Sequence, residues 1–112
     1  MSHEHSTGPN SWMASDQVAV ATADIVRHAV VGKSHIIESI AMYIYNNTVE
    51  VGWGTDAGVI EHILWKIKVP ANQGGQLSTR LIHPVKVPPN KAIIIKATGA
   101  SDYSYVIEGI TE

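Results

Sequence analysis

The stretch VPPN-KAIIIKAT-GASD, residues 87–102, places a short apolar run between two segments rich in turn residues. Pro, Asn, Gly and Asp favour turns, whereas the run Ile93-Ile94-Ile95 consists of the β-branched side chains that strands prefer. Three consecutive isoleucines are apolar on both faces of a strand, which is typical of a strand in the middle of a sheet. The sequence therefore predicts a buried central strand within residues 91–98.

The same alternation of short apolar segments and turns continues through most of the chain. Breaks such as Gly32-Lys33, Asn46-Asn47 and Pro70 separate stretches rich in Val, Ile, Thr and Tyr, and no segment shows a helical apolar period. We therefore expect an all-β protein, a single small jelly-roll-like β-sandwich of about eight antiparallel strands over residues 16–112. The expected strands cover residues 18–23 and 25–31 (two strands or one bent strand), 35–46, 48–53, 63–69, 76–82, 91–98 and 103–110.

The longest expected strand places apolar side chains at alternate positions from Ile36 to Ile44 on its inner face, with an interruption at Glu38. Its other face then carries Tyr43 and Tyr45. The strand over residues 63–69 is expected to point Ile63, Trp65 and Ile67 inward and its lysines outward.

The first fifteen residues are polar and show no strand or helix period, so residues 1–15 are expected to form a flexible N-terminal arm. Apart from Met1, its only large apolar residues are Trp12 and Met13. Trp12 is expected to anchor the arm, either by closing over the edge of its own domain or by docking on another subunit, because exposed Trp favours interfaces.

Composition limits the partners of the chain. A formal net charge of −2 with eight Lys and Arg residues offers no basic patch to neutralise phosphates, so we expect no nucleic-acid partner. No apolar run approaches the roughly 20 residues of a membrane-spanning helix, and the start MSHEHS lacks the features of a signal peptide, so we expect no membrane contact. Without cysteine there is no disulfide, no thiolate nucleophile and no cysteine-bound zinc.

The aromatic residues offer two readings. Tyr43 and Tyr45 share one strand face, as do Tyr103 and Tyr105, and two such strands side by side would form an aromatic stripe. Such a stripe serves cross-strand packing or a subunit interface, or alternatively stacks sugars as in a carbohydrate-binding module. Trp53, between Gly52 and Gly54 at an expected loop, is the best single candidate for a contact residue.

Metal binding and catalysis receive little support from the sequence. Of the six histidines, His3 and His5 flank Glu4 in the arm, while His28, His35 and His62 are isolated along strands, so no metal site is predicted. A site formed by residues that the fold brings together, or one shared by subunits at a three-fold axis, stays an open alternative. A nucleophile elbow, a phosphate-binding glycine loop and a metalloprotease motif are all missing from the sequence, so we expect no catalytic residues and no enzyme.

Several features follow one another in a characteristic order from Ala23 to Glu112. They are Gly32-Lys33, YIYNN at 43–47, Gly54-Thr55, Pro70, Gly74-Gly75, HPVKVP at 83–88, KAI at 91–93 and a final strand containing tyrosine. In this order of strands and loops the chain resembles small virion proteins of tailed bacteriophages, which are one-domain β-sandwiches used for capsid decoration or as tail and fibre modules. The polar arm with His3 and His5 departs from the simplest of these proteins.

The resemblance implies a non-enzymatic virion protein without a cofactor, a decoration or cement protein that binds the major capsid protein on the capsid exterior and stabilises the shell. It implies synthesis in the host cytoplasm, a place on the capsid surface and a homotrimer whose weak contacts combine through multivalency. A tail, adaptor or fibre module and a carbohydrate-binding module are the alternatives. The candidate residues for capsid or subunit contact are Trp12, Met13, Tyr43, Tyr45, Trp53, Tyr103 and Tyr105.

Overall fold

In a computed structural model of the chain, the structure describes residues 3–5, 10–18, 23–99 and 103–112. These residues form nine β-strands and no helix, which confirms the expected all-β fold. The strands are β1 (His3–His5), β2 (Ser11–Val18), β3 (Ala23–Arg27), β4 (His35–Tyr45), β5 (Thr48–Gly54), β6 (Ile60–Lys68), β7 (Gly74–Lys86), β8 (Ala92–Ala97) and β9 (Tyr103–Thr111).

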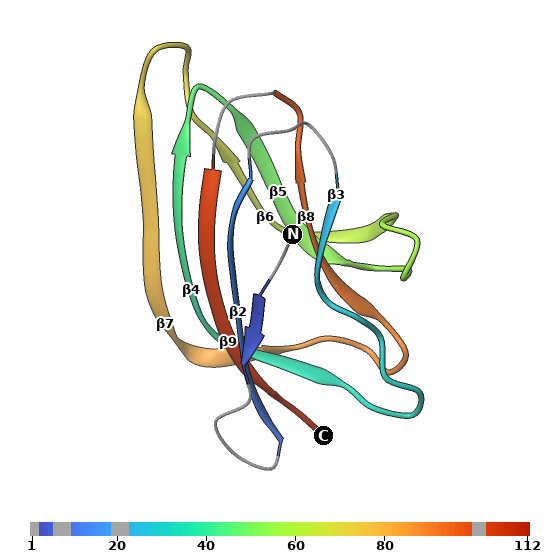
Figure 1. Cartoon of the computed structure of the whole chain (residues 1–112). Coiled ribbons are helices and arrows are strands. Elements are labelled where there is room, and N and C mark those ends of the chain that lie inside the picture. Colours follow the sequence, from blue (N-terminus) through green and yellow to red (C-terminus); the bar gives the residue numbers. More distant parts are fainter. Residues whose placement is uncertain (1–2, 6–9, 19–22, 100–102) are drawn as a thin grey trace.

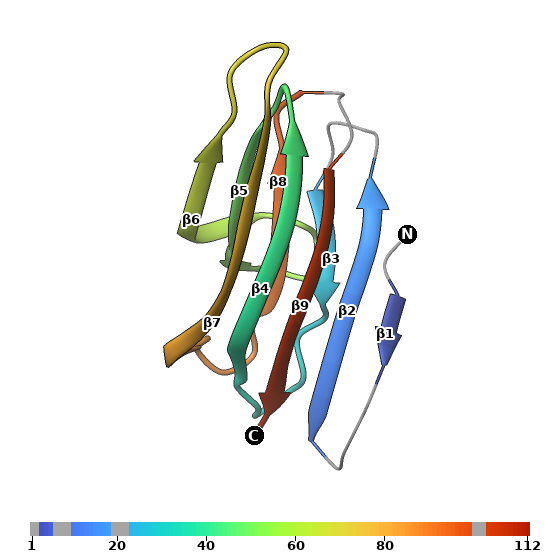
Figure 2. The ribbon, with the colours of Figure 1, turned by 90° about the vertical axis from the view of Figure 1, so that its left-hand side faces the viewer.

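The strands build two sheets that pack face to face (Figures 1 and 2). One sheet has five strands in the order β1-β2-β9-β4-β7, and the other has four in the order β3-β8-β5-β6. All neighbouring strands run antiparallel. The apolar side chains between the sheets form one core, as expected of a small β-sandwich.

The strand order is that of one long antiparallel ribbon rolled up on itself. The hairpin β5–β6 forms the end of the ribbon, and β4 then pairs with β7, β3 with β8 and β2 with β9. Rolling brings β9 beside β4 and β8 beside β5, which completes a four-stranded sheet in each layer. This connectivity is a jelly roll, to which β1 adds one further strand along β2.

The isoleucine run forms the centre of β8, which lies between β3 and β5. Ile93 and Ile95 belong to the core between the sheets, and Ile94 is equally buried on the opposite face of the strand. The expected central strand, buried on both faces, is therefore confirmed.

The connection between β5 and β6 explains why the outer face of β8 is buried. A side chain at Gly54 would overlap the main-chain carbonyl of Val59, so glycine lets the connection fold tightly against β5. Further along, the main-chain N–H of Ala29, beyond β3, donates a hydrogen bond of 2.8 Å to the carboxylate of Asp56. The connection therefore reaches from β5 across to the β3 side, and the chain covers this outer face with its own residues.

β4 departs from the expected alternation near Glu38. The ladders to both neighbouring strands shift between Ile37 and Ser39, which marks a β-bulge. Because the bulge reverses the alternation, Ile37 is fully buried and Ile36 is only partly so. The expectation that Ile36 faces the core was therefore wrong, while Ile44 lies in the core as predicted.

The same irregularity lengthens β7. Arg80 pairs with Ser39 and Val85 pairs with Ile37, so residues 81–84 form a protruding segment opposite a single residue of β4. The strand resumes after this segment and continues to Lys86, although His83-Pro84 was expected to end it. Ile82 in the protruding segment is 90% exposed.

The N-terminal region also differs from the expectation. β2 begins at Ser11 and pairs with β9 along its whole length, so the part of residues 1–15 from Ser11 onward belongs to the sandwich rather than to a flexible arm. Trp12 and Ala14 alternate on the inner face and lie in the core. The alternation was hard to recognise because the second inward residue is as small as alanine.

Candidate functional site

The two sheets differ in how their outer faces are covered. The four-stranded sheet is overlaid by the β5–β6 connection, whose Gly58 approaches Ala23 of β3 closely. The five-stranded sheet has no corresponding cover among the described residues. Besides Ile82 of β7, three large apolar or aromatic side chains of its strands remain exposed. They are Tyr43 at 46%, Tyr45 at 41% and Val106 at 38%.

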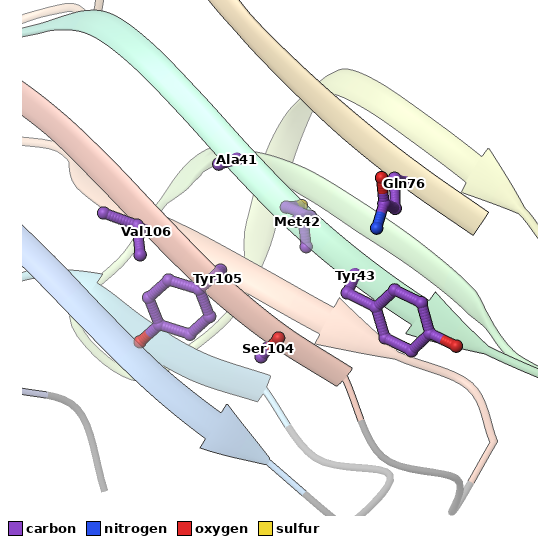
Figure 3. A pocket seen from close by; sticks show the side chains of 7 residues that line it. All are labelled: Ala41, Met42, Tyr43, Gln76, Ser104, Tyr105 and Val106. Carbon is purple, nitrogen blue, oxygen red and sulfur yellow. The ribbon is translucent and has the colours of Figure 1, made fainter. Parts of the chain in front are cut away.

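Strand register brings these side chains together. Tyr43 lies opposite Ser104 of β9 on one side and opposite Gln76 of β7 on the other. Ala41 lies opposite Val106. Together with Met42 and Tyr105, these residues line an open depression of about 340 Å³ on β7, β4 and β9 (Figure 3).

Gly74 at the start of β7 helps to place the Tyr43 ring. A Cβ atom at Gly74 would lie 2.6 Å from the Tyr43 hydroxyl oxygen, so the phenol occupies the space that a side chain would fill. A glycine on one strand and an aromatic ring on the next form a recognised cross-strand pair. Tyr43 is therefore supported from β7 while 46% of its surface stays accessible.

The lining of the depression is uncharged. It combines apolar surface from Val106, Ala41 and the Tyr43 ring with the polar groups of Gln76, Ser104 and the phenol (Figure 3). Tyrosine contributes both a large apolar area and a hydroxyl, with little entropy to lose. Such a surface suits a flat, neutral partner, such as a protein surface or a sugar ring, rather than a highly charged ligand.

Tyr103 and Tyr105 do not extend this surface. Tyr103 pairs with Ile44, and Tyr105 pairs with Met42, so both share the inner face with these core residues. The predicted aromatic stripe of four tyrosines is therefore wrong: the two pairs lie on adjacent strands but on opposite faces. Both inner tyrosines are almost completely buried, and their rings stack at 6.4 Å.

A small acidic cluster accompanies the inner tyrosines. The Tyr105 hydroxyl donates a hydrogen bond of 2.5 Å to the carboxylate of Asp24. Burial, and then the hydrogen bond to Asp24, raise the pKa of Tyr105 well above its ordinary value. Burial, and then the negative charges of Asp24 and Asp16, raise the pKa of Tyr103 in the same direction. Both phenols are therefore held in the neutral form.

Two other predicted contact residues, Trp12 and Trp53, make their main contacts within the domain. Trp12 is buried, packs edge-on against His35 at 6.1 Å and carries the guanidinium of Arg27 over its ring at 5.7 Å. Trp53 lies within β5 rather than in a loop, packs against the core and stacks on His62 at 5.4 Å. Neither indole is a free platform. Of the two alternatives for Trp12, the structure shows packing within its own domain.

Met13 is partly buried on β2, opposite Glu108 of β9. Because Trp12 points into the core, strand alternation places Met13 on the outer face of the same sheet as Tyr43 and Tyr45. Of the seven predicted contact residues, these three share the outer face. The other four have structural contacts in the core.

The histidines serve different roles where the structure describes their side chains. His35 is fully buried; its Nε2–H donates to the main-chain carbonyl of His28, and its Nδ1 lies 2.8 Å from the Thr111 hydroxyl. His28 lies 3.4 Å from the Asp56 carboxylate at the surface. Within the described ranges, no three His, Asp or Glu side chains are grouped to hold a metal ion.

A second hollow, of about 450 Å³, lies beside the β5–β6 connection. Its two carboxylates already have partners, since Glu50 lies 3.6 Å from Lys66 and Glu61 lies 2.6 Å from Lys91. Ile63, expected to point inward, is 44% exposed at this hollow, because two register shifts between β5 and β6 alter the alternation of β6.

Sequence reasoning found the tyrosines of the outer face but missed their neighbours. Gln76, Ser104 and Val106 became part of the depression through the pairing of β4 with β7 and β9. The alternation along each strand indicates which residues share a face, but the partner strand and its register are long-range properties.

Among the described residues, no helix is long and apolar enough to cross a membrane.

The chain was also compared with known proteins. No protein-family model matches it, and no curated protein matches it in sequence.

Proposed function

We propose that this chain is a non-enzymatic binding and assembly protein that contacts its partner through the outer face of the five-stranded sheet. The observation that carries the proposal is the exposure of Tyr43 and Val106 at an open and uncharged depression, with Tyr45 exposed on the same face of the sheet. Solvent-exposed tyrosines on a rigid sheet are typical of contact surfaces, because they bury much area at little entropic cost. The outer face of the other sheet is partly covered by the β5–β6 connection, and the carboxylates that line the hollow beside it already have lysine partners.

In line with its resemblance to small phage proteins, we assign this binding role to capsid decoration. The partner is then the major capsid protein, the location is the outer surface of the virion, and the tyrosine face seats on the shell. Jelly rolls occur in viral capsid proteins and in lectins, which is compatible with this role although a fold alone does not specify a function. Several copies held together would convert weak contacts of this size into firm attachment.

A carbohydrate-binding role is the second candidate. It is favoured by the chemistry of the depression, where the exposed Tyr43 ring lies beside the amide of Gln76 and the hydroxyl of Ser104. Aromatic rings stack on the apolar faces of sugars, and amide and hydroxyl groups bond to sugar hydroxyls. A tail or fibre module with the same surface is a variant of the first proposal and differs from it in location on the particle.

The test is co-sedimentation of the purified chain with decoration-free capsids of tailed phages, in parallel with binding to a glycan array. The double variant Tyr43→Ser/Tyr45→Ser removes both exposed rings and should weaken capsid binding by about a thousandfold, since each aromatic anchor at an interface contributes about 2 kcal/mol. The matched control is Val31→Ser, because Val31 is 92% exposed in the β3–β4 connection, away from the sheet face.

A second variant perturbs the same surface without removing a tyrosine. Gly74→Ala introduces a methyl group where the Tyr43 hydroxyl lies, so the ring has to move. We expect binding to fall with little change in the free energy of unfolding. Capsid binding that is equal in the wild type and the double variant would contradict the proposed face. Glycan binding that is lost in the double variant, without any capsid binding, would support the carbohydrate alternative.

A further inference from the structure

The free edge of the five-stranded sheet is formed by β7. The strand order ends there, and β7 is thirteen residues long. Just before it, the main-chain N–H of Asn46 donates to the carbonyl of Gln73 at 3.0 Å, which is one half of a hydrogen-bonded pair, while the N–H of Gln73 donates to Pro70. Such pairs alternate with non-hydrogen-bonded pairs along an antiparallel ladder. The next pairs therefore leave alternate residues with N–H and C=O groups pointing away from β4: Gly74, Gln76, Ser78 and Arg80.

The other sheet edges in the described part of the chain are short or interrupted. β1 has three residues, and β3 has five with a register shift. β6 shifts register twice against β5 and carries Lys66 and Lys68. Short length, bulges, charges and proline are the devices that keep an edge strand from pairing with another chain. Residues 74–79 have none of them: they contain no proline and no charged residue, and the ladder to β4 is regular there.

We propose that β7 is the interface with a second copy of this chain, which adds its own β7 antiparallel across a two-fold axis. With Leu77 at the axis, Gly74 lies opposite Arg80, and Gln76 lies opposite Ser78 of the other copy. All outward N–H and C=O groups of residues 74–80 then find partners. The register places no charged residue opposite a like charge, which would be destabilising.

A second copy fits this edge better than an unrelated strand. Residues 74–80 can pair with the same residues of the second copy. A two-fold interface uses the same edge in both copies, so it closes after two chains and leaves no further β7 edge free. The protruding segment 81–84, which contains Pro84, limits the pairing to the regular part of β7.

This pairing joins the two five-stranded sheets into one sheet of ten strands. A two-fold axis perpendicular to the sheet keeps the same face of both copies on one side. Tyr43, which contacts Gly74 of β7, is then close to the axis in both copies. The proposal concerns the edge alone and holds whatever the tyrosine face binds. It predicts a dimer, in contrast to the trimer implied by the resemblance to phage proteins.

The first test is the mass in solution, measured by light scattering during size-exclusion chromatography of the full chain over a hundredfold range of concentration. We expect twice the chain mass of 12.1 kDa at high concentration. Amide hydrogen exchange at both ends of this range is the second test. The N–H groups of Gln76, Ser78 and Arg80 should exchange slowly only in the dimer, whereas those of Gly75 and Leu77, which face β4, should be protected in both states.

The variant test uses two substitutions at one position. Gln76→Pro removes an outward N–H without removing a bond to β4, and should raise the dissociation constant about tenfold or more. Gln76→Ala loses the same side chain but keeps the N–H and should dimerise like the wild type.

A chain that is monomeric or trimeric at every concentration would overturn the proposal. A dimer in which the outward amides exchange as fast as in the monomer would overturn it as well. If Gln76→Pro fails to fold, the exchange measurement on the wild type decides. Loss of dimerisation with unchanged capsid binding in Ser78→Pro, which removes an outward N–H at a position outside the depression, would separate the edge from the tyrosine face.

Discussion

Raising the pH above 10 should destabilise this protein through its two buried tyrosines, Tyr103 and Tyr105. The fold raises the pKa of both phenols, first by burial and then through Asp24. A group with a raised pKa contributes stability that is fully present below its unfolded pKa of about 10 and is lost as the pH rises toward the folded value. The loss begins near pH 10 because the unfolded chain then releases protons that the native state retains.

The magnitude follows from proton linkage. A tyrosine that keeps its proton in the native state loses at most about 1.4 kcal/mol of stability per pH unit, and the pair at most about 2.7 kcal/mol. The free energy of unfolding of a small domain is about 5 to 15 kcal/mol in total, so a rise of one pH unit removes a substantial share of it. Urea unfolding at pH 8, 9, 10 and 11 measures the free energy of unfolding directly, and tyrosinate absorbance follows ionisation.

Phenylalanine variants isolate this effect from other groups that titrate in the same range. Tyr105→Phe should reduce the slope of stability against pH above 10 by about half, and Tyr103→Phe/Tyr105→Phe should remove the tyrosine contribution. The comparison cancels the titration of lysines, which is common to all three proteins. Parallel loss of stability in the wild type and the double variant between pH 9 and 11 would refute the reasoning.

Three further substitutions test the packing. Ile94→Ala should cost about 2 to 5 kcal/mol because Ile94 is fully buried on the covered outer face, whereas the control Ile82→Ala, at a 90% exposed position, should stay within about 0.5 kcal/mol; urea unfolding compares them. Gly109→Ala should destabilise the fold by about 3 kcal/mol or prevent folding, since a Cβ there would overlap a main-chain carbonyl of β4; thermal unfolding shows this. Asp56→Ala removes the acceptor for the N–H of Ala29 and should cost about 1 kcal/mol, with faster amide exchange at that residue.

The fold class could be predicted from the sequence because its evidence is local. The run from Ile93 to Ile95 and the turn residues around it indicated a buried central strand, and the structure has that strand as β8. Asn46 adopts a positive φ of 48°, which asparagine tolerates, so the break between β4 and β5 could also be predicted from the sequence.

The candidate site depended on features that local patterns do not contain. The bulge near Glu38 reverses the faces of β4, and the interruption of the apolar alternation at Glu38 did not by itself indicate that reversal. Tyr103 and Tyr105 follow the same i, i+2 spacing as Tyr43 and Tyr45, yet pairing in a register displaced by one residue puts them on the opposite face. Spacing along one strand defines which residues share a face. Which of the two faces of a strand becomes the core side depends on how that strand pairs with its neighbours.

The position of β9 between β2 and β4 has a consequence for how the protein is made. Ser11 pairs with Ile110, so one ladder joins segments from opposite ends of the sequence. Such contacts close very long loops and slow folding, because the entropy of closure is lost before the pairing stabilises the product. During synthesis, β2 and β4 leave the ribosome early and have no strand between them until Thr111 has been added. The sandwich is therefore completed only after β9 has been released, and until then the edges of β2 and β4 are open to pairing with other chains.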